Sequence, residues 1–245
     1  MDGEEAYREE QGTLYISVEE KSGFPAPGKT PVATITPTLP AFTPGPTPAA
    51  GSPAPFRLSV AQYDAMIEAG ILTEDHKVEL VGGVLFRKMP KKGPHSIASR
   101  ETFKVLDRLM PSGYFVTRED PVRIPDYDEP EPDISIVRGQ SRDYSIQPDA
   151  SRVALVVEVS DATLAYDRGE KLLAYAVGGI PAYWIVNLAG GTPLGSGQLE
   201  VYTEPSGRVD PVAYRRCVVL KPTDQIELAI DGQILGRIAI SALLP

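Results

Sequence analysis

The segment VALVVEV at residues 153–159 constrains the fold more than any other stretch of the chain. A strand covered on both faces is apolar almost without interruption, and this segment is apolar at every position except Glu158. Burying a carboxylate costs several kcal/mol unless the group is paired, protonated or bound to a cation. The segment therefore predicts a central strand whose one acid has a task other than packing.

Two more charged residues lie in the segments that flank this strand. Asp133 opens a second strand candidate, PDISIV at 132–137, and Lys171 lies in a helix-like run from Ala165 to Val177. If the two strands are neighbours in a sheet, the carboxylates of Asp133 and Glu158 can project from one face, a few ångströms apart. A divalent cation would relieve their repulsion, and oxygen ligands favour Mg²⁺ or Mn²⁺ over zinc.

Each of these three residues also has a structural explanation. Asp133 could cap a turn or pair with an arginine, and Glu158 could form a buried salt bridge with Lys171. Lys171 could instead pair with Asp167, four residues earlier on the helix. Because a dry strand is a costly place for an ion pair without a further role, the pattern favours Glu158 as a metal ligand. For Lys171 alone, the ordinary ion pair is the better explanation.

Other candidates carry weaker signals. Glu79, between Val78 and Leu80 in a predicted hairpin, could complete the metal site or could face solvent. His95 could contact phosphate at a helix N-terminus. The remaining candidates are expected to be structural, as helix caps or core residues: Asp161, Asp167, Tyr175 and Cys217.

Composition excludes several classes of protein. A single cysteine rules out an internal disulfide and a multi-cysteine zinc site, and it suits a reducing compartment. The acidic N-terminus lacks the features of a secretory signal, and no run approaches the ~18 apolar residues of a membrane span. Glycine-rich phosphate loops and the Gly-x-Ser-x-Gly elbow are absent. We therefore expect a cytoplasmic protein without membrane contact.

The formal net charge of −9 argues against a nucleic-acid ligand, but its distribution weakens that argument. Residues 1–24 hold seven acidic side chains against two basic ones, whereas residues 87–108 hold seven basic side chains against two acidic ones. A predicted helix at 95–110 aligns its basic side chains in one stripe. The expected nucleic-acid contacts in this region are Lys91, Lys92, His95, Arg100 and Lys104.

The chain divides into a tail and a domain. Residues 1–55 are acidic and then rich in Pro and Thr, and ten of the 24 prolines fall between residues 25 and 55. Such a segment is expected to be extended, without a packed core, so we place the ordered domain at 56–245.

Within the domain, the patterns alternate between helix and strand. Helices are predicted after Ser59, at 95–110 and at 165–177, and a hairpin is predicted around Gly82-Gly83. The remaining strand candidates are YFVTRE, PVRIP, AYWIVNL, QLEVYT, AYRRCVVL and QIELAI, followed by a closing strand and turn. This order predicts a mixed α/β sandwich with additional antiparallel strands.

Several motifs together resemble the Uma-type restriction endonuclease family, a domain of unknown function in the PD-(D/E)XK nuclease superfamily. They are VELVGGVL, PHSIA, PDISIV, LVVEVSD, YDRGEKLLAYAVGGIPAYWIVNL and QLEVY, and the resemblance spans about residues 56–245. It implies a restriction-endonuclease-like mixed central sheet flanked by helices. It also implies that Asp133 is the aspartate of the PD motif, that Glu158 is the acid of the third strand, and that Glu79 is the acid of the early hairpin. Ser160 stands where the superfamily has its lysine, and the matching lysine looks like Lys171 on the next helix.

The resemblance and the residues together predict a Mg²⁺-dependent endonuclease acting on DNA, with Mn²⁺ as a substitute ion. In this hypothesis Asp133 and Glu158 hold the ion, Glu79 binds the same or a second ion, and Lys171 assists the chemistry. A homodimer is compatible with double-strand cutting. Two alternatives stay open: an inert nucleic-acid-binding or protein-interaction module of the same fold, and a hydrolase of another phosphate ester.

Overall fold

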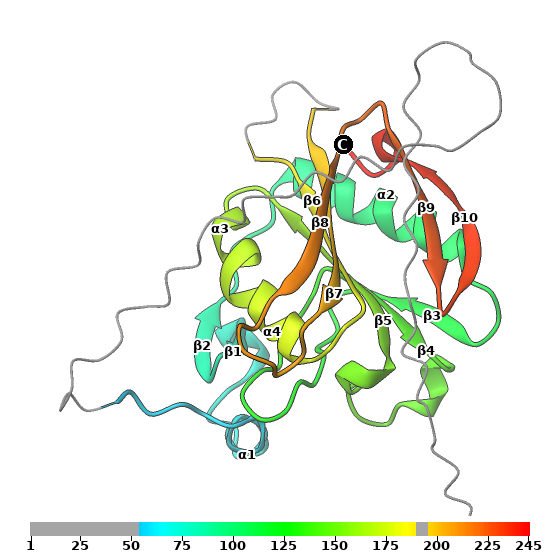
Figure 1. Ribbon diagram of the computed structural model, residues 1–245. Coiled ribbons are helices and arrows are strands. Elements are labelled where there is room, and N and C mark those ends of the chain that lie inside the picture. Colours follow the sequence, from blue (N-terminus) through cyan, green and yellow to red (C-terminus); the bar gives the residue numbers. More distant parts are fainter. Residues whose placement is uncertain (1–53, 190–195) are drawn as a thin grey trace, which may run out of the picture.

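The computed structural model describes residues 54–189 and 196–245, so the predicted tail lies almost entirely outside the described residues. A six-stranded sheet in the order β3-β4-β5-β6-β7-β8 forms the centre (Figure 1). β5 and β6 pair in parallel and every other pair in this sheet is antiparallel, which confirms the predicted mixed sheet. The strands are β3 Tyr114–Thr117, β4 Ile134–Arg138, β5 Val153–Ser160, β6 Ala182–Asn187, β7 Gln198–Pro205 and β8 Tyr214–Leu220.

Both faces of the sheet are covered, as the apolar β5 requires. Leu155, Val157 and Val159 pack on the face beneath α2 (Gly93–Leu109), together with the hairpin of β9 (Gln225–Ile230) and β10 (Gln233–Ala239). Val156 packs on the opposite face, with residues of α4 (Leu172–Val177). Because side chains alternate along a strand, Glu158 and Ser160 belong to the α4 face as well. All eight residues of β5 are buried, which confirms the central strand.

The predicted helix at 165–177 is divided into three parts. A short α3 (Leu164–Tyr166) leads into a π-helical turn, Asp167–Lys171, and then into α4. π-turns are rare and occur often at functional sites. Here the turn buries Asp167 and Lys171 against the sheet.

The N-terminal part of the domain forms as its caps and glycines predict. Ser59 begins α1 (Val60–Glu68) with a capping box, and Gly70 takes a left-handed φ just after the helix. β1 (Val78–Val81) and β2 (Val84–Arg87) form the predicted hairpin, with Gly82 and Gly83 at positive φ in the turn.

One predicted strand is wrong. PVRIP at 121–125 makes only isolated bridges, Arg123 to Asp149 and Ile124 to Asp128. Prolines at both ends of this segment have no N–H to donate to a ladder, and Val122 and Ile124 are buried as loop residues that pack on the α4 face. At the C-terminus, the predicted closing strand is β10, followed by a short turn at Ile240–Ala242.

No helix among the described residues combines the length and the apolar character needed to cross a membrane.

The hairpin turn gives a prediction about stability. A Cβ on Gly83 would lie 2.6 Å from Arg57 Cβ and 3.1 Å from the Leu58 carbonyl oxygen, whereas a Cβ on Gly82 would meet no atom closer than 3.7 Å. Both glycines have positive φ, so Gly82→Ala should lower the free energy of unfolding by about 1 kcal/mol. Gly83→Ala should cost roughly 1–2 kcal/mol more, because it adds a backbone clash.

Urea denaturation of the two variants and the parent protein measures this difference. Equal losses for Gly82→Ala and Gly83→Ala would show that residues 57 and 58 do not pack closely on the turn.

Candidate active site

Asp133, the residue before β4, lies across from Glu158 on β5. Ile134 pairs with Val157 at the end of the β4–β5 ladder, which places Asp133 opposite Glu158, one step further on. Ile134 and Val157 both pack on the α2 face, so Glu158 projects from the α4 face, whereas Asp133, one residue before β4, contacts Lys91 and His95 at the start of α2. Asp133 is 6% exposed and Glu158 is 4% exposed. Two buried acids thus lie at the same end of the β4–β5 ladder.

The carboxylate of Glu158 receives two hydrogen bonds on one oxygen. Lys171 Nζ donates to Glu158 Oε1 at 2.8 Å, and Tyr175 Oη donates to the same atom at 2.7 Å. Among the described residues, no group donates to Oε2. The π-turn and α4 supply both donors, and they leave the second oxygen of Glu158 available for a ligand.

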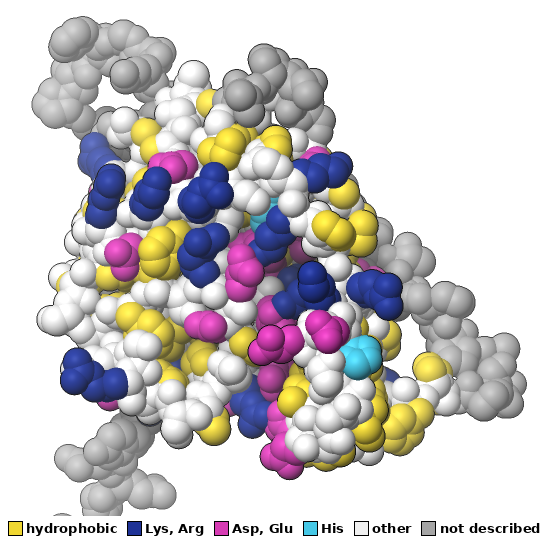
Figure 2. All heavy atoms as spheres, turned by 180° about the vertical axis from the view of Figure 1, so that it is seen from behind, with side chains coloured by type: hydrophobic (Ala, Val, Ile, Leu, Met, Phe, Trp, Pro, Cys, Tyr) yellow, Lys and Arg dark blue, Asp and Glu magenta, His cyan; other side chains and the backbone are white. Residues whose placement is uncertain are grey.

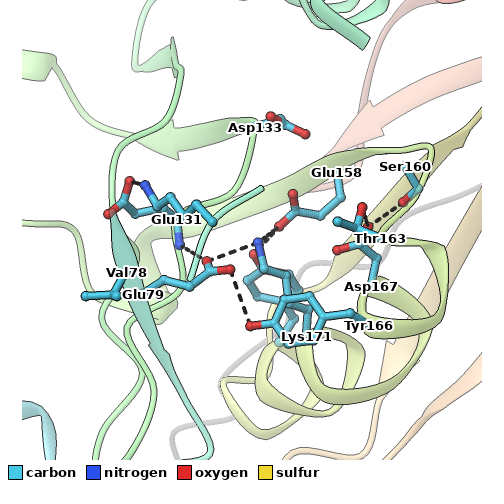
Figure 3. A network of polar contacts seen from close by, with 12 residues as sticks. Val78, Glu79, Glu131, Asp133, Glu158, Ser160, Thr163, Tyr166, Asp167 and Lys171 are labelled. Atoms are coloured by element: carbon cyan, nitrogen blue, oxygen red, sulfur yellow. Dashed lines mark hydrogen bonds and ion pairs between the residues drawn. The ribbon is translucent and has the colours of Figure 1, made fainter. Parts of the chain in front are cut away.

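Lys171 joins Glu158 to Glu79. Its ammonium lies 3.1 Å from Glu79 Oε2, and this oxygen also accepts the backbone N–H of Glu131 at 2.9 Å. Tyr166 Oη donates to Glu79 Oε1 at 3.3 Å. Figure 3 shows Glu79 and Glu158 on either side of the Lys171 ammonium, with Asp133 standing apart from this network. The predicted pairing of Lys171 with Asp167 is replaced by contacts with two other acids, while Asp167 accepts from Ser160 and Thr163.

Asp133 has its own set of donors. The Val159 N–H donates to Oδ2 at 2.8 Å, and His95 Nε2 lies 3.2 Å from the same oxygen. Lys91 Nζ lies 2.8 Å from Oδ1 and 2.9 Å from Glu119 Oε1. Two of the residues predicted to contact nucleic acid, Lys91 and His95, are thus directed at the candidate metal ligand.

The environment shifts the pKa of each central group. Burial raises the pKa of Glu158 to about 8, although Lys171 opposes the change. Burial alone would lower the pKa of Lys171, but Glu158, Glu79 and Asp167 outweigh it and hold that pKa well above its ordinary value. For Asp133, burial would raise the pKa, but His95 and Lys91 hold it well below the ordinary value. The site therefore keeps Asp133 ionised and Lys171 charged, whereas Glu158 holds its proton more tightly.

The donor atoms fit a hard divalent cation with few protein ligands. Mg²⁺ keeps several waters and is commonly bound through one or two carboxylates. Asp133 and Glu158 Oε2 can supply those two, and the structure places Glu79 on the far side of Lys171. Among the described residues, no three His, Cys, Asp or Glu side chains gather closely enough to hold a metal by themselves.

The basic stripe of α2 lies on the surface. Arg100, Lys104 and Arg108 are exposed, and Lys104 pairs with Glu101 at 2.8 Å. Lys92, just before the helix, lies 3.7 Å from Asp161. Figure 2 shows Lys and Arg side chains gathered over the upper part of the face that α2 covers, above a run of acidic side chains.

A second ion pair, between the buried Glu200 and the half-exposed Arg168, lies further along the same sheet face. Glu200 on β7 is 1% exposed and accepts two hydrogen bonds from Arg168. This pair was missed from the sequence, although QLEVY carries the same signal as VALVVEV, an acid between apolar residues of a buried strand.

Comparison with known proteins identifies the family. The family model described as "Uma2: Putative restriction endonuclease" matches residues 60–235, which is most of the chain. The chain belongs to the Uma2 family. A comparison with curated proteins found no match.

The fold of this Uma2 protein also has a relative among solved structures. It is similar to the structure titled "Crystal structure of a putative nuclease belonging to DUF820 from Anabaena variabilis ATCC 29413", with a TM-score of 0.51 and 16% sequence identity. The match covers 73% of this chain and 96% of the other. The likeness confirms the predicted nuclease-type fold, and the family supports nuclease activity at a general level.

The raised pKa of Glu158 predicts how stability depends on pH. Its value in the folded protein, about 8, exceeds the ordinary 4.5 of an unfolded chain. The stability that this carboxyl contributes at low pH is therefore lost as the pH rises through about 8. Glu158→Gln stays neutral, so the stability advantage of the parent protein over Glu158→Gln should shrink between about pH 5 and pH 8.5, by on the order of 2 kcal/mol.

Urea denaturation in EDTA, at several pH values across this range, measures the difference. An advantage of the parent protein that grows with pH would mean that the ion pair with Lys171 outweighs burial.

Proposed function

We propose that this protein is a Mg²⁺-dependent endonuclease that hydrolyses phosphodiester bonds of DNA. One observation carries the proposal: two buried acids, Asp133 just before β4 and Glu158 on β5, lie at the same end of the ladder between these strands, and the buried Lys171 from the next helical segment donates to Glu158. The family and the fold support a nuclease in general. The metal and the substrate come from the chemistry of the donors.

Each residue has a role that its contacts suggest. Asp133 and Glu158 Oε2 would hold the ion, which when bound polarises a phosphoryl oxygen and supplies hydroxide near neutral pH. Tyr175 and Lys171 fix the Glu158 carboxylate through Oε1. The Lys171 ammonium would also stabilise the negative charge that develops on the phosphate. Glu79 would anchor that ammonium, and it could act as a ligand only after releasing it.

The segment before α2 would connect the metal site to DNA. Lys91 now holds Asp133 Oδ1, so an ion at this oxygen would have to displace the ammonium. Phosphate is a natural acceptor for the displaced lysine, and the exposed Arg100 and Lys104 lie on the same helix face. Cutting both strands of a duplex would require two such sites, and therefore two copies of the chain.

A second candidate function has its own observation. Both oxygens of Asp133 already have a partner, Lys91 on Oδ1 and His95 on Oδ2, as in a site closed to other ligands. This arrangement would suit an inert DNA-binding module of the same fold. The two candidates differ in whether the protein takes up a metal ion and cleaves.

Plasmid cleavage with Mg²⁺ or Mn²⁺ tests the proposal. The parent protein should nick or linearise DNA, and Asp133→Asn or Glu158→Gln should each lower the rate by more than about a hundredfold. The reason is that mutating even a residue that only hydrogen-bonds a metal ligand typically lowers metal affinity or activity 10–100-fold. Asp75→Asn, at an exposed position on a separate turn, is the matched control and should cleave normally.

Thermal unfolding gives a readout that does not depend on catalysis. Mn²⁺ at about a hundred times its Kd should stabilise the parent protein by about 2.7 kcal/mol and should leave Asp133→Asn unchanged. DNA binding without cleavage, and without any Mn²⁺-induced shift, would favour the inert module.

The basic stripe predicts a salt effect. Replacing Arg100, Lys104 and Arg108 by Gln should weaken binding to every duplex sequence alike. The slope of log K against log salt should become shallower by roughly 0.9 for each phosphate that the variant no longer neutralises. An unchanged slope in fluorescence anisotropy titrations would place the DNA on another surface.

A further inference from the structure

Glu200 continues the row of acids that contains the candidate site. Glu158 on β5 pairs with Ile185 on β6, and Ile185 pairs with Glu200 on β7. Residues that face each other across a ladder project from the same side, so Glu200 lies on the same face as Glu158. Two strand spacings separate Glu158 from Glu200, which is roughly 10 Å between their Cα atoms.

The Glu200 carboxylate is fully engaged. Asn187 Nδ2 donates to Oε1 at 2.7 Å, and Tyr202 Oη donates to Oε2 at 2.9 Å. Arg168 donates to both oxygens, through Nη2 to Oε1 at 2.6 Å and through Nε to Oε2 at 2.9 Å. Burial would raise the pKa of Glu200, but these donors outweigh it and hold the pKa below its ordinary value. The carboxylate is therefore an ionised and immobile support for the arginine.

Arg168 is held in place but is not buried. Its side chain keeps 35% of its surface exposed, over a Glu200 side chain that is only 2% exposed. The two bonds to Glu200 use two of the five N–H groups of a guanidinium, so one edge is fixed and others can meet solvent. A guanidinium oriented in this way is prepared to bind a phosphate through two parallel hydrogen bonds.

The π-turn links this arginine to the candidate site. Arg168 and Lys171 lie on the same five-residue turn, and each is directed at a different acid of the row. A rigid segment thus presents one buried cation beside Glu158 and one half-exposed cation two strands away.

We propose that Arg168 binds a backbone phosphate of the DNA, at a subsite beside the cutting centre. This inference rests on the proposed function. Because the two acids that these cations contact lie roughly 10 Å apart between their Cα atoms, the phosphate bound by Arg168 would belong to a nucleotide close to the cleaved bond. Arg168 is therefore a positioning residue that sets the register of the strand, and it does not touch the reacting phosphate.

The test uses a double variant of the full chain. Arg168→Met with Glu200→Gln removes both charges, so no buried carboxylate is left unpaired and the net charge of the protein is unchanged. The glutamine introduced by Glu200→Gln keeps a carbonyl oxygen, which can still accept a hydrogen bond from Asn187 or Tyr202. Circular dichroism and thermal unfolding establish that the variant is folded, and the Mn²⁺-induced shift establishes that the metal site is intact.

Binding to a fluorescent duplex is measured in EDTA over a range of salt concentrations. The double variant should bind about tenfold more weakly at low salt, and its log K against log salt slope should be shallower by about 0.9, because it neutralises one phosphate fewer. Glu200→Gln alone keeps the Arg168 charge and should retain the slope of the parent protein. Arg168→Lys keeps the positive charge but loses the paired N–H donors of the guanidinium. This variant should bind DNA several-fold more weakly, with the same slope of log K against log salt as the parent protein.

Three outcomes separate the possibilities. A folded double variant with the affinity and slope of the parent protein overturns the subsite and leaves the proposed function standing. If the double variant does not fold, Arg168→Lys decides, and unchanged affinity in that variant overturns the subsite. If the parent protein shows no salt-dependent DNA binding, the proposed function itself fails, and the subsite fails with it.

Discussion

The burial of the Glu158 carboxyl group inside the sheet is the constraint on which the rest of the structure depends. A carboxylate at 4% exposure on the central strand needs donors, and the chain supplies Lys171 and Tyr175 from one helical segment. Burying Lys171 in turn requires a second acid, and Glu79 on the separate β1–β2 hairpin provides it. The ion pairs therefore connect the sheet, the π-turn and the N-terminal hairpin, elements that are far apart in the sequence.

This arrangement also explains why the helix after β5 is not regular. An unbroken helix would place Asp167 and Lys171 one turn apart as an ordinary surface pair. In the π-turn both are buried, Asp167 accepts from the hydroxyls of Ser160 and Thr163, and Lys171 reaches Glu158. Ser160 thus helps to anchor the segment that carries Lys171.

The fold could be predicted to a large extent because its signals are local. Burial on two faces, the glycines of the hairpin and the cap at Ser59 each determine a short segment, and each was found as expected. The segment 121–125 was predicted wrongly. The alternation of Val122 and Ile124 resembles a strand, but the prolines at both ends have no N–H group to donate to a neighbouring strand.

The candidate site was predictable only in part. An acid in an apolar strand is visible in the sequence, so Glu158 could be found, and Glu200 could have been found by the same rule. The partners are long-range. Nothing in the sequence near Lys91 or His95 indicates that they meet Asp133, and their basic surroundings suggested contacts with DNA instead. The metal role of Asp133, Glu158 and Glu79 remains a proposal.

Diffraction from crystals soaked in Mn²⁺, with data collected at the manganese absorption edge, tests the central claim most directly. We expect one anomalous peak between a carboxylate oxygen of Asp133 and Oε2 of Glu158, with Lys91 displaced from Asp133 and Lys171 still bound to Oε1. Retention of the contact between Lys91 and Asp133, with no peak between the two acids at saturating Mn²⁺, would contradict it.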